Sequence, residues 1–282
     1  MKGPKSNFDQ LIEIMAQLRG PEGCPWDREQ THKKLKPFLL EESYEVLDAI
    51  ESGTDEDLVE ELGDVLLQVV FHSQIGEEEN RFTIDDVLEA IVDKLIRRHP
   101  HVFGDVKIED ADHVVTKWEQ IKLAERNNNQ EKLASALDGV PAELPALLRA
   151  QRVQEKASRI GFDWTEISGP LDKVSEEIEE FRHEISVACE LIAGDKKKDN
   201  LSEHDFDRIE EEIGDLLFSL VNVGRFLGIC CEDGLRIAIN KFERRFLAVE
   251  NKFRSEDRPM NELTLEEMDG AWNAIKEKEA GN

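Results

Sequence analysis

The stretch that decides the fold is Glu-Leu-Gly-Asp-Val-Leu-Leu-Gln-Val-Val-Phe-His, residues 61–72. It is apolar on most sides, as a helix buried in a protein interior is. At about 100° per residue, Glu61, Asp64, Gln68 and His72 fall within a sector of roughly 80°. A buried ionised carboxylate is costly unless it is paired or binds a cation. The stripe therefore predicts a basic partner or a metal ion beside Glu61 and Asp64, with Gln68 and His72 as ordinary buried hydrogen-bonding groups.

A second stripe of this kind lies at residues 212–222, where the polar side chains line one side of an apolar segment. The two halves of the chain also agree, in order, at five points. These are a Gly…Trp loop, Glu-Glu-x-x-Glu at 41–45 and 176–180, Glu-x-Gly-Asp at 61–64 and 212–215, Lys-x-x-x-Arg at 94–98 and 241–245, and Trp-x-x-x-Lys at 118–122 and 272–276. Such ordered repetition indicates an internal duplication.

Helical periodicity dominates the chain, and alternating strand patterns are scarce. Pro37 suits a first helical turn and Gly53 a helix end, while Thr54 or Asp55, Thr83 and Thr264 suit helix starts. We expect helices at about 7–18, 37–52, 54–75, 83–98, 112–126, 144–160, 171–193, 203–227, 232–253 and 264–278. The fold class is therefore all-α. The polar run at 127–130 suggests a linker at 127–138 between repeats at 1–126 and 139–282.

The composition of the chain limits the kinds of molecule that it can bind and the cellular setting that it fits. The 282 residues carry a net charge of −27, which argues against nucleic acid as the main partner. Four cysteines without zinc-binding spacing fit a reducing, cytosolic setting. No stretch of about 18 apolar residues exists, so we expect no membrane span, and the first 18 residues lack a signal-peptide pattern. We expect a cytoplasmic protein.

The acidic motifs of each half can converge on one metal site. Glu42 and Glu45 are neighbours on one helix, and Glu61 and Asp64 on the next, so antiparallel packing would bring four or more carboxylates together. No lysine or arginine lies within either cluster to neutralise them. Hard divalent cations take all-oxygen ligands, which predicts Mg²⁺, with Mn²⁺ as a substitute. Such a site would recruit a phosphate ester and activate water for attack on phosphorus.

Two other interpretations of the carboxylates remain open. They can form a solvated helix face, which we accept for Glu179 and Glu184. They can also form a di-iron site, which uses Glu-x-x-His motifs on paired helices. Glu180-x-x-His183 has that pattern, but its counterpart in the first repeat has Asp48 in place of the histidine.

Basic and aromatic residues are candidates for holding a substrate. The pairs Lys94 with Arg98 and Lys241 with Arg245 are each one helical turn apart, so each can hold the outer phosphates of a triphosphate. Their alternative is an exposed basic patch. The tryptophans Trp118 and Trp272 can stack on a base or close the helical bundle, and packing is the commoner use.

The motifs also resemble a known family. Glu-Glu-x-x-Glu followed by Glu-x-x-Asp on consecutive helices is similar to the signature of the MazG-like, all-α nucleoside triphosphate pyrophosphohydrolases. Gly-Cys-Pro-Trp-Asp at 23–27, Arg-Arg-His-Pro-His-Val-Phe at 97–103 and Lys-Phe-Glu-Arg-Arg-Phe at 241–246 match it too. The resemblance implies Mg²⁺-dependent hydrolysis of NTPs or dNTPs to the monophosphate and pyrophosphate, in a house-cleaning role. It also implies a four-helix-bundle architecture completed in a homodimer.

Site residues follow from this resemblance position by position. The implied metal ligands are Glu42, Glu45, Glu61 and Asp64 in the first repeat and Glu177, Glu180, Glu212 and Asp215 in the second. Glu41 and Glu176, the first glutamates of each motif, are the candidate catalytic residues. The implied substrate-binding residues are Lys241, Arg245 and Trp272, with Lys94, Arg98 and Trp118 as their first-repeat counterparts.

An insertion around residues 194–205 separates Glu180 from Glu212 by more than the family's usual spacing. If it only lengthens two helices and their loop, the second site survives. We favour the second repeat as the active one, because its basic residues and tryptophan all match. The first repeat stays a candidate. The alternative function is a non-catalytic nucleotide-binding or dimerisation protein, and base preference cannot be read from the sequence.

Overall fold

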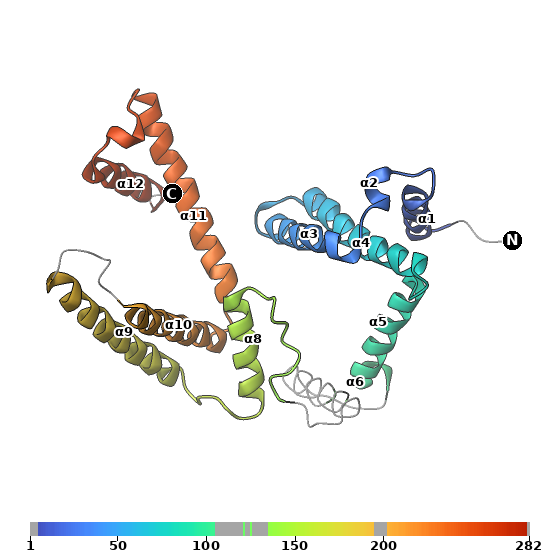
Figure 1. Cartoon of the computed structure of the whole chain (residues 1–282), viewed down its shortest axis with the longest axis horizontal. Helices are drawn as coiled ribbons and strands as arrows, with labels where there is room; N and C mark the ends of the chain where they lie inside the picture. Colours follow the sequence, from blue (N-terminus) through green and yellow to red (C-terminus); the bar gives the residue numbers. More distant parts are fainter. Residues whose placement is uncertain (1–4, 105–120, 122–124, 126–134, 195–201, 281–282) are drawn as a thin grey trace. The chain divides into compact units, whose positions relative to one another are not determined.

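The computed structural model describes residues 5–104, 121, 125, 135–194 and 202–280, which form helices joined by loops and, within these ranges, no strand (Figure 1). The predicted all-α class is confirmed. Contacts divide the chain into two units, Met1–Ile121 and Lys122–Asn282. The linker at 127–138 stays a prediction, because residues 126–134 and most of the expected helix at 112–126 lie outside the described residues.

The first unit is built on a pair of long helices. Its helices are α1 (Asn7–Arg19), α2 (Pro25–Arg28), α3 (His32–Ser52), α4 (Asp55–Glu78), α5 (Ile84–Arg98) and α6 (Pro100–Phe103). α3 and α4 lie side by side, joined by Gly53 and Thr54 (Figure 1). Thr54 caps α4, since its hydroxyl accepts from the Asp57 amide while the Asp57 carboxylate accepts from the Thr54 amide. This tight connection makes the two helices antiparallel.

The core of the first unit lies against the C-terminal half of α4. Its buried apolar side chains are Met15 from α1, Leu35 from α3, and Val70, Phe71 and Ile75 from α4. The expectation of a helix buried on most sides is wrong for the N-terminal half of α4. There Val59 is 72% exposed and Leu62 is 51% exposed, because no element in the described part of the first unit covers that face.

Two helix boundaries differ from the predictions. α3 begins at His32 rather than Pro37, because Thr31 caps it by accepting from the Lys34 amide. Pro37 is tolerated inside the helix, since it is exposed and the carbonyl that loses its donor belongs to the exposed Lys33. α4 runs through Gly76 to Glu78, and the turn comes at Asn80, whose φ is 54°.

The second unit repeats the paired helices. Its elements are α8 (Ala146–Arg159), α9 (Ser168–Gly194), α10 (Glu203–Phe226), α11 (Cys231–Ser255), the 3₁₀ helix η2 (Met260–Glu262) and α12 (Leu265–Ala280). α9 packs along α10, and α8 packs on α10 and α11 (Figure 1). α11 also packs on α12 around Val249, Phe253 and Ala271. The predicted cap at Thr264 is confirmed, because its hydroxyl accepts from the Glu267 amide at 3.2 Å.

No single described helix has both the length and the apolar character needed to cross a bilayer. Taken together across their 106° bend, α10 and α11 meet those two criteria by length and composition alone.

Candidate functional site

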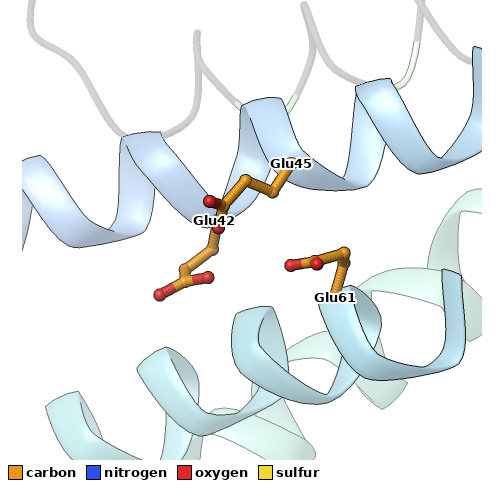
Figure 2. A group of neighbouring side chains, drawn as sticks. All are labelled: Glu42, Glu45 and Glu61. Carbon is orange, nitrogen blue, oxygen red and sulfur yellow. The ribbon is translucent and has the colours of Figure 1, made fainter. Parts of the chain in front are cut away.

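The first carboxylate cluster joins α3 to α4. Glu42 and Glu45 extend from α3 and Glu61 from α4, and Figure 2 shows the three side chains in the space between these helices. One oxygen of each lies within 4.8 Å of the others. Burial, the neighbouring carboxyl of Glu45 and the charge of Asp64 raise the pKa of Glu42. Burial and the charges of Glu45 and Asp64 likewise raise the pKa of Glu61.

The second carboxylate cluster joins α9 to α10 in the same way. Glu177 and Glu180 from α9 and Glu212 from α10 each offer an oxygen within 4.8 Å of the others. Glu177 is buried, and one oxygen of Glu212, Oε2, is buried without a hydrogen-bond partner among the described residues. Burial first, then the charges of Glu180, Glu177 and Asp215, raise the pKa of the Glu212 carboxyl.

Both clusters fit a hard divalent cation. Each offers only carboxylate oxygens, the ligands that such cations prefer. A bound cation would give the unpartnered Glu212 oxygen a partner among the described residues and would offset the mutual repulsion of the carboxylates. Neither cluster includes a histidine among the described residues, and His183 of the Glu-x-x-His pattern is exposed, so the geometry does not favour the di-iron interpretation.

The expectation that no basic residue neutralises either cluster is wrong for the second one. Lys173 Nζ lies 2.6 Å from a Glu177 oxygen and 2.9 Å from a Glu176 oxygen. Hydrogen bonds to Glu177 and then Glu176 raise the pKa of Lys173. Lys173 and Glu177 are four residues apart, and side chains at this spacing are neighbours on a helix. This contact could therefore have been predicted from the sequence. The first repeat has Phe38 at this position, four residues before Glu42.

The two glutamates that we assigned to a solvated face behave differently. Glu179 is exposed, as predicted, and the structure adds that it pairs with Arg182 at 2.7 Å. For Glu184 the prediction is wrong, because its side chain is buried and pairs with Arg208 of α10. The pair bridges α9 and α10, which the sequence could not indicate without knowing that these helices are neighbours.

A cavity of about 750 Å³ borders the second cluster, because Lys173, Glu177 and Asp215 are part of its lining. Helices α8, α9 and α10, the loop before α9 and residues 135–137 supply the rest of the wall. Its aromatic members are Phe162, Trp164 and Phe218, and its further polar members are Ser135, Gln154, Asp163, Ser219, Asn222 and Arg225. This volume lies within the range of small-molecule sites.

The matching positions of the first repeat are occupied by core side chains. Aligning Glu42 with Glu177 and Glu61 with Glu212 pairs the cavity residues Pro170, Lys173, Phe218 and Asn222 with Leu35, Phe38, Leu67 and Phe71. Leu35 and Phe71 are buried in the core of the first unit, and Phe38 and Leu67 pack against it. The two repeats therefore share their carboxylates but not the space beside them.

The predicted substrate-binding residues of the second repeat lie on α11 and α12. Arg245 Nε donates to Glu279 at 2.7 Å, and its guanidinium carbon lies 5.9 Å from the centre of the Trp272 ring. Trp272 packs against Phe242, which supports the packing interpretation of this ring. In the described part of the chain, Lys241 and Arg245 make no hydrogen bond or ion pair with the second cluster. Their role stays a prediction.

The remaining candidates also stay predictions. Lys94 and Arg98 lie on α5, and Trp118 falls outside the described residues. Glu41 and Glu176 are exposed, and neither contributes to the group of converging oxygens.

The fold and its clusters define a class of all-α proteins in which pairs of helices present glutamates to a divalent cation. Residues 30–103 and 169–249 each match the model of the MazG nucleotide pyrophosphohydrolase domain, so the chain belongs to this family as a two-repeat member. It is 46% identical over 275 residues to the nucleoside triphosphate pyrophosphohydrolase of Escherichia coli K12, covering 97% of this chain and 98% of that protein.

Two further relatives agree with this assignment. The nucleoside triphosphate pyrophosphohydrolase/pyrophosphatase MazG of Thermotoga maritima is 43% identical over 269 residues, covering 95% of both chains. The uncharacterized protein YabN of Bacillus subtilis is 46% identical over 272 residues, which is 96% of this chain and 52% of that protein. The family that the motifs indicated is confirmed.

Proposed function

We propose that the protein hydrolyses nucleoside triphosphates, deoxynucleotides included, to the monophosphate and pyrophosphate, in a house-cleaning role in the cytoplasm. The observation that carries this proposal is the second glutamate cluster bordering a cavity of small-molecule size. The names of the E. coli and T. maritima relatives support the same reaction.

The required metal ion would be held by Glu177, Glu180, Glu212 and Asp215. Bound there, Mg²⁺ or a substituting Mn²⁺ supplies the positive charge that neutralises a triphosphate and lowers the pKa of a water molecule. Lys173 adds a second positive charge at the same edge of the cavity, and its ammonium can exchange Glu177 for a phosphate oxygen. Glu176, beside Lys173, is the candidate for orienting the attacking water.

The second repeat is proposed as the active one. It combines a carboxylate cluster with an open cavity, whereas the matching positions of the first repeat are filled by Leu35, Phe38, Leu67 and Phe71. The first cluster can still bind a cation. We propose that it serves mainly in stability and assembly.

A homodimer is part of the proposal. α11 packs on α8, α10 and α12, and among the described residues Arg245 pairs with Glu279, while neither it nor Lys241 pairs with the second carboxylate cluster. A second copy could bring these cations to the triphosphate and cover the exposed apolar faces of α4 and α5.

A matched pair of substitutions tests the proposed function in the full-length protein. Glu212→Gln removes a ligand of the second cluster, and Glu61→Gln removes its counterpart in the first. With saturating Mg²⁺, we expect pyrophosphate release to fall at least about 100-fold in Glu212→Gln and to change little in Glu61→Gln. Thermal unfolding should show both variants folded.

Other outcomes discriminate the alternatives. Full activity in Glu212→Gln would contradict the assignment of the second site. If the wild type binds nucleotide but releases no pyrophosphate with either Mg²⁺ or Mn²⁺, the protein is a non-catalytic nucleotide-binding protein instead.

A further inference from the structure

A chain of hydrogen bonds within the cavity lining fixes the orientation of Asn222. Asp163, in the loop before α9, accepts from both terminal nitrogens of Arg225 at 2.6 and 3.0 Å. Arg225 Nε in turn donates to Asn222 Oδ1 at 2.7 Å. Because the guanidinium is always a donor, the oxygen of the Asn222 amide must face it. The amide nitrogen Nδ2 is then the group left to donate, and no described residue accepts from it.

Gln154 is a second amide side chain in the cavity lining, and here the nitrogen is the bonded atom and the oxygen is left over. Gln154 Nε2 donates to the backbone carbonyl of Phe218 at 2.8 Å, and only the nitrogen of an amide can do so. Gln154 is 7% exposed, and its oxygen Oε1 is buried without a partner among the described residues. An unpaired buried acceptor costs free energy, which a ligand donor can recover.

Asn222 and Gln154 are therefore a free donor and a free acceptor on two helices that line one cavity. Asn222 is itself 8% exposed, so both amides are held in place by their surroundings. The aromatic rings of Trp164 and Phe218 belong to the same wall and offer faces for stacking. A planar ligand that carries both a hydrogen-bond donor and an acceptor would supply the partners that these two amides lack among the described residues.

We propose that Asn222 and Gln154 bind the hydrogen-bonding edge of the substrate's nucleobase, with Asp163 and Arg225 as positioning residues for Asn222. This inference rests on the proposed function, because it places the triphosphate at the second cluster. Every natural nucleobase carries both a donor and an acceptor on its Watson–Crick edge. The site should therefore accept all of them and discriminate against triphosphates that lack the base or its donor.

The first repeat has no equivalent of this arrangement. Phe71, a core residue, stands at the position of Asn222, and Gln74 stands at that of Arg225. Base recognition of this kind is thus confined to the second repeat.

Three substrates and two substitutions test the inference in the full-length protein. ATP has both groups on its base edge, purine riboside triphosphate keeps the ring acceptor but lacks the donor, and inorganic tripolyphosphate has no base. We expect the wild type to prefer ATP over purine riboside triphosphate by about 10-fold or more in kcat/KM. Gln154→Met should abolish this preference. Asn222→Leu should lower kcat/KM for both nucleotides about 10-fold while the preference remains.

Hydrolysis of tripolyphosphate to pyrophosphate and phosphate is the internal control, and neither substitution should change it. Asn222→Asp keeps the acceptor for Arg225 but removes the donor, so it is a control for misfolding of Asn222→Leu. It should lower nucleotide turnover as Asn222→Leu does. Equal turnover of ATP and purine riboside triphosphate by the wild type would overturn the inference. It would also be overturned if the substitutions lowered the hydrolysis of tripolyphosphate as much as the hydrolysis of the nucleotides.

Failure of the proposed function gives a different result, namely no turnover of any of the three compounds by the wild type. The inference is then tested by calorimetric binding of ATP and purine riboside triphosphate. The inference is supported if the wild type binds purine riboside triphosphate 10-fold more weakly than ATP and if Gln154→Met removes this difference. Equal binding of the two nucleotides by the wild type would overturn it.

Discussion

At the scale of single residues, burial and like charge decide how the carboxylates behave. Glu212 places one oxygen in the interior without a partner in the part of the chain that the structure describes, and the charges of Glu180, Glu177 and Asp215 act on it. The sequence indicates this conflict, because four acidic residues fall on apolar helices. The spacing of four residues between Lys173 and Glu177 also indicates that Lys173 can relieve part of it, and the structure shows this contact at 2.6 Å.

The raised pKa of Glu212 gives a prediction for the metal-free protein. The folded state binds the proton more tightly than the unfolded chain, whose carboxyl has a pKa of about 4.3. The resulting stabilisation is present below that value and is lost as the pH rises through the folded pKa. In EDTA, Glu212→Gln should therefore raise the melting temperature at pH 7 and leave it unchanged near pH 4.

Thermal unfolding across this pH range is the measurement, and Glu179→Gln is the control. Glu179 is exposed and paired with Arg182, so its substitution should not reproduce the gain at pH 7. A lower melting temperature of metal-free Glu212→Gln at pH 7 would contradict the electrostatic account.

A histidine pair in the first unit gives a second prediction, in which stability is lost as the pH falls rather than as it rises. Arg81 donates to His32 Nε2, so His32 must donate through Nδ1 to His72 Nδ1, 2.7 Å away. Burial, and then His32, lower the pKa of His72. The stabilisation is present above the unfolded pKa of about 6.5 and is lost as the pH falls through the folded value.

We expect the melting temperature of the wild type to drop between pH 7.5 and 5.5 by more than that of His72→Gln. Differential scanning calorimetry over this range checks it. His183→Gln, at an exposed position of α9, should follow the wild type. Identical pH dependence of His72→Gln and the wild type would show that the pair does not titrate in this window.

At the scale of helices, local chemistry predicted most starts and ends. Thr54, Thr83 and Thr264 cap helices as expected, because a threonine hydroxyl accepts from an amide in the first turn. The sequence predicts that this helix ends at about residue 75, but Gly76 lies inside α4. Its missing side chain makes room for the Phe82 ring, a contact between residues that only the folded chain brings together.

Two glycines of α4 therefore respond oppositely to alanine. In Gly76→Ala, the new Cβ would lie 2.7–2.8 Å from Phe82 ring carbons, which should destabilise the protein by about 1–3 kcal/mol. Among the described residues, no atom beyond the backbone of its own helix turn and its chain neighbours lies within 4 Å of the Gly63 Cβ position, so Gly63→Ala should stabilise the helix by about 0.5–1 kcal/mol. Urea unfolding of both variants measures the difference. Loss of stability in Gly63→Ala would indicate a neighbour from a second chain.

At the scale of the whole molecule, apolar side chains remain uncovered in the single chain. Five residues of α5, Leu88, Ile91, Val92, Leu95 and Ile96, are each 37–50% exposed. Contiguous apolar surface of this kind marks sites of association. The predicted homodimer would cover this surface of α5 and also the exposed N-terminal half of α4.

We expect the wild type to sediment as a dimer at micromolar concentration. Leu95→Glu should shift it toward the monomer, because a charge would be buried in the interface. Glu89→Gln, at another exposed position of α5, should leave the dimer intact. A monomeric wild type in analytical ultracentrifugation would contradict the predicted homodimer.

The sequence by itself determined the all-α class, the duplication, the family and, in each repeat, three glutamates that converge; the predicted ligands Asp64 and Asp215 are not among the converging groups. The features that the sequence determined depend on helical periodicity and on spacings of three or four residues, which act within one helix or between two connected helices. Only the tertiary structure decided that the repeats differ beside their clusters. Whether Phe71 fills a core and Asn222 faces a cavity depends on how α1 and α8 pack on the paired helices, and packing between distant segments leaves no periodic trace in the chain.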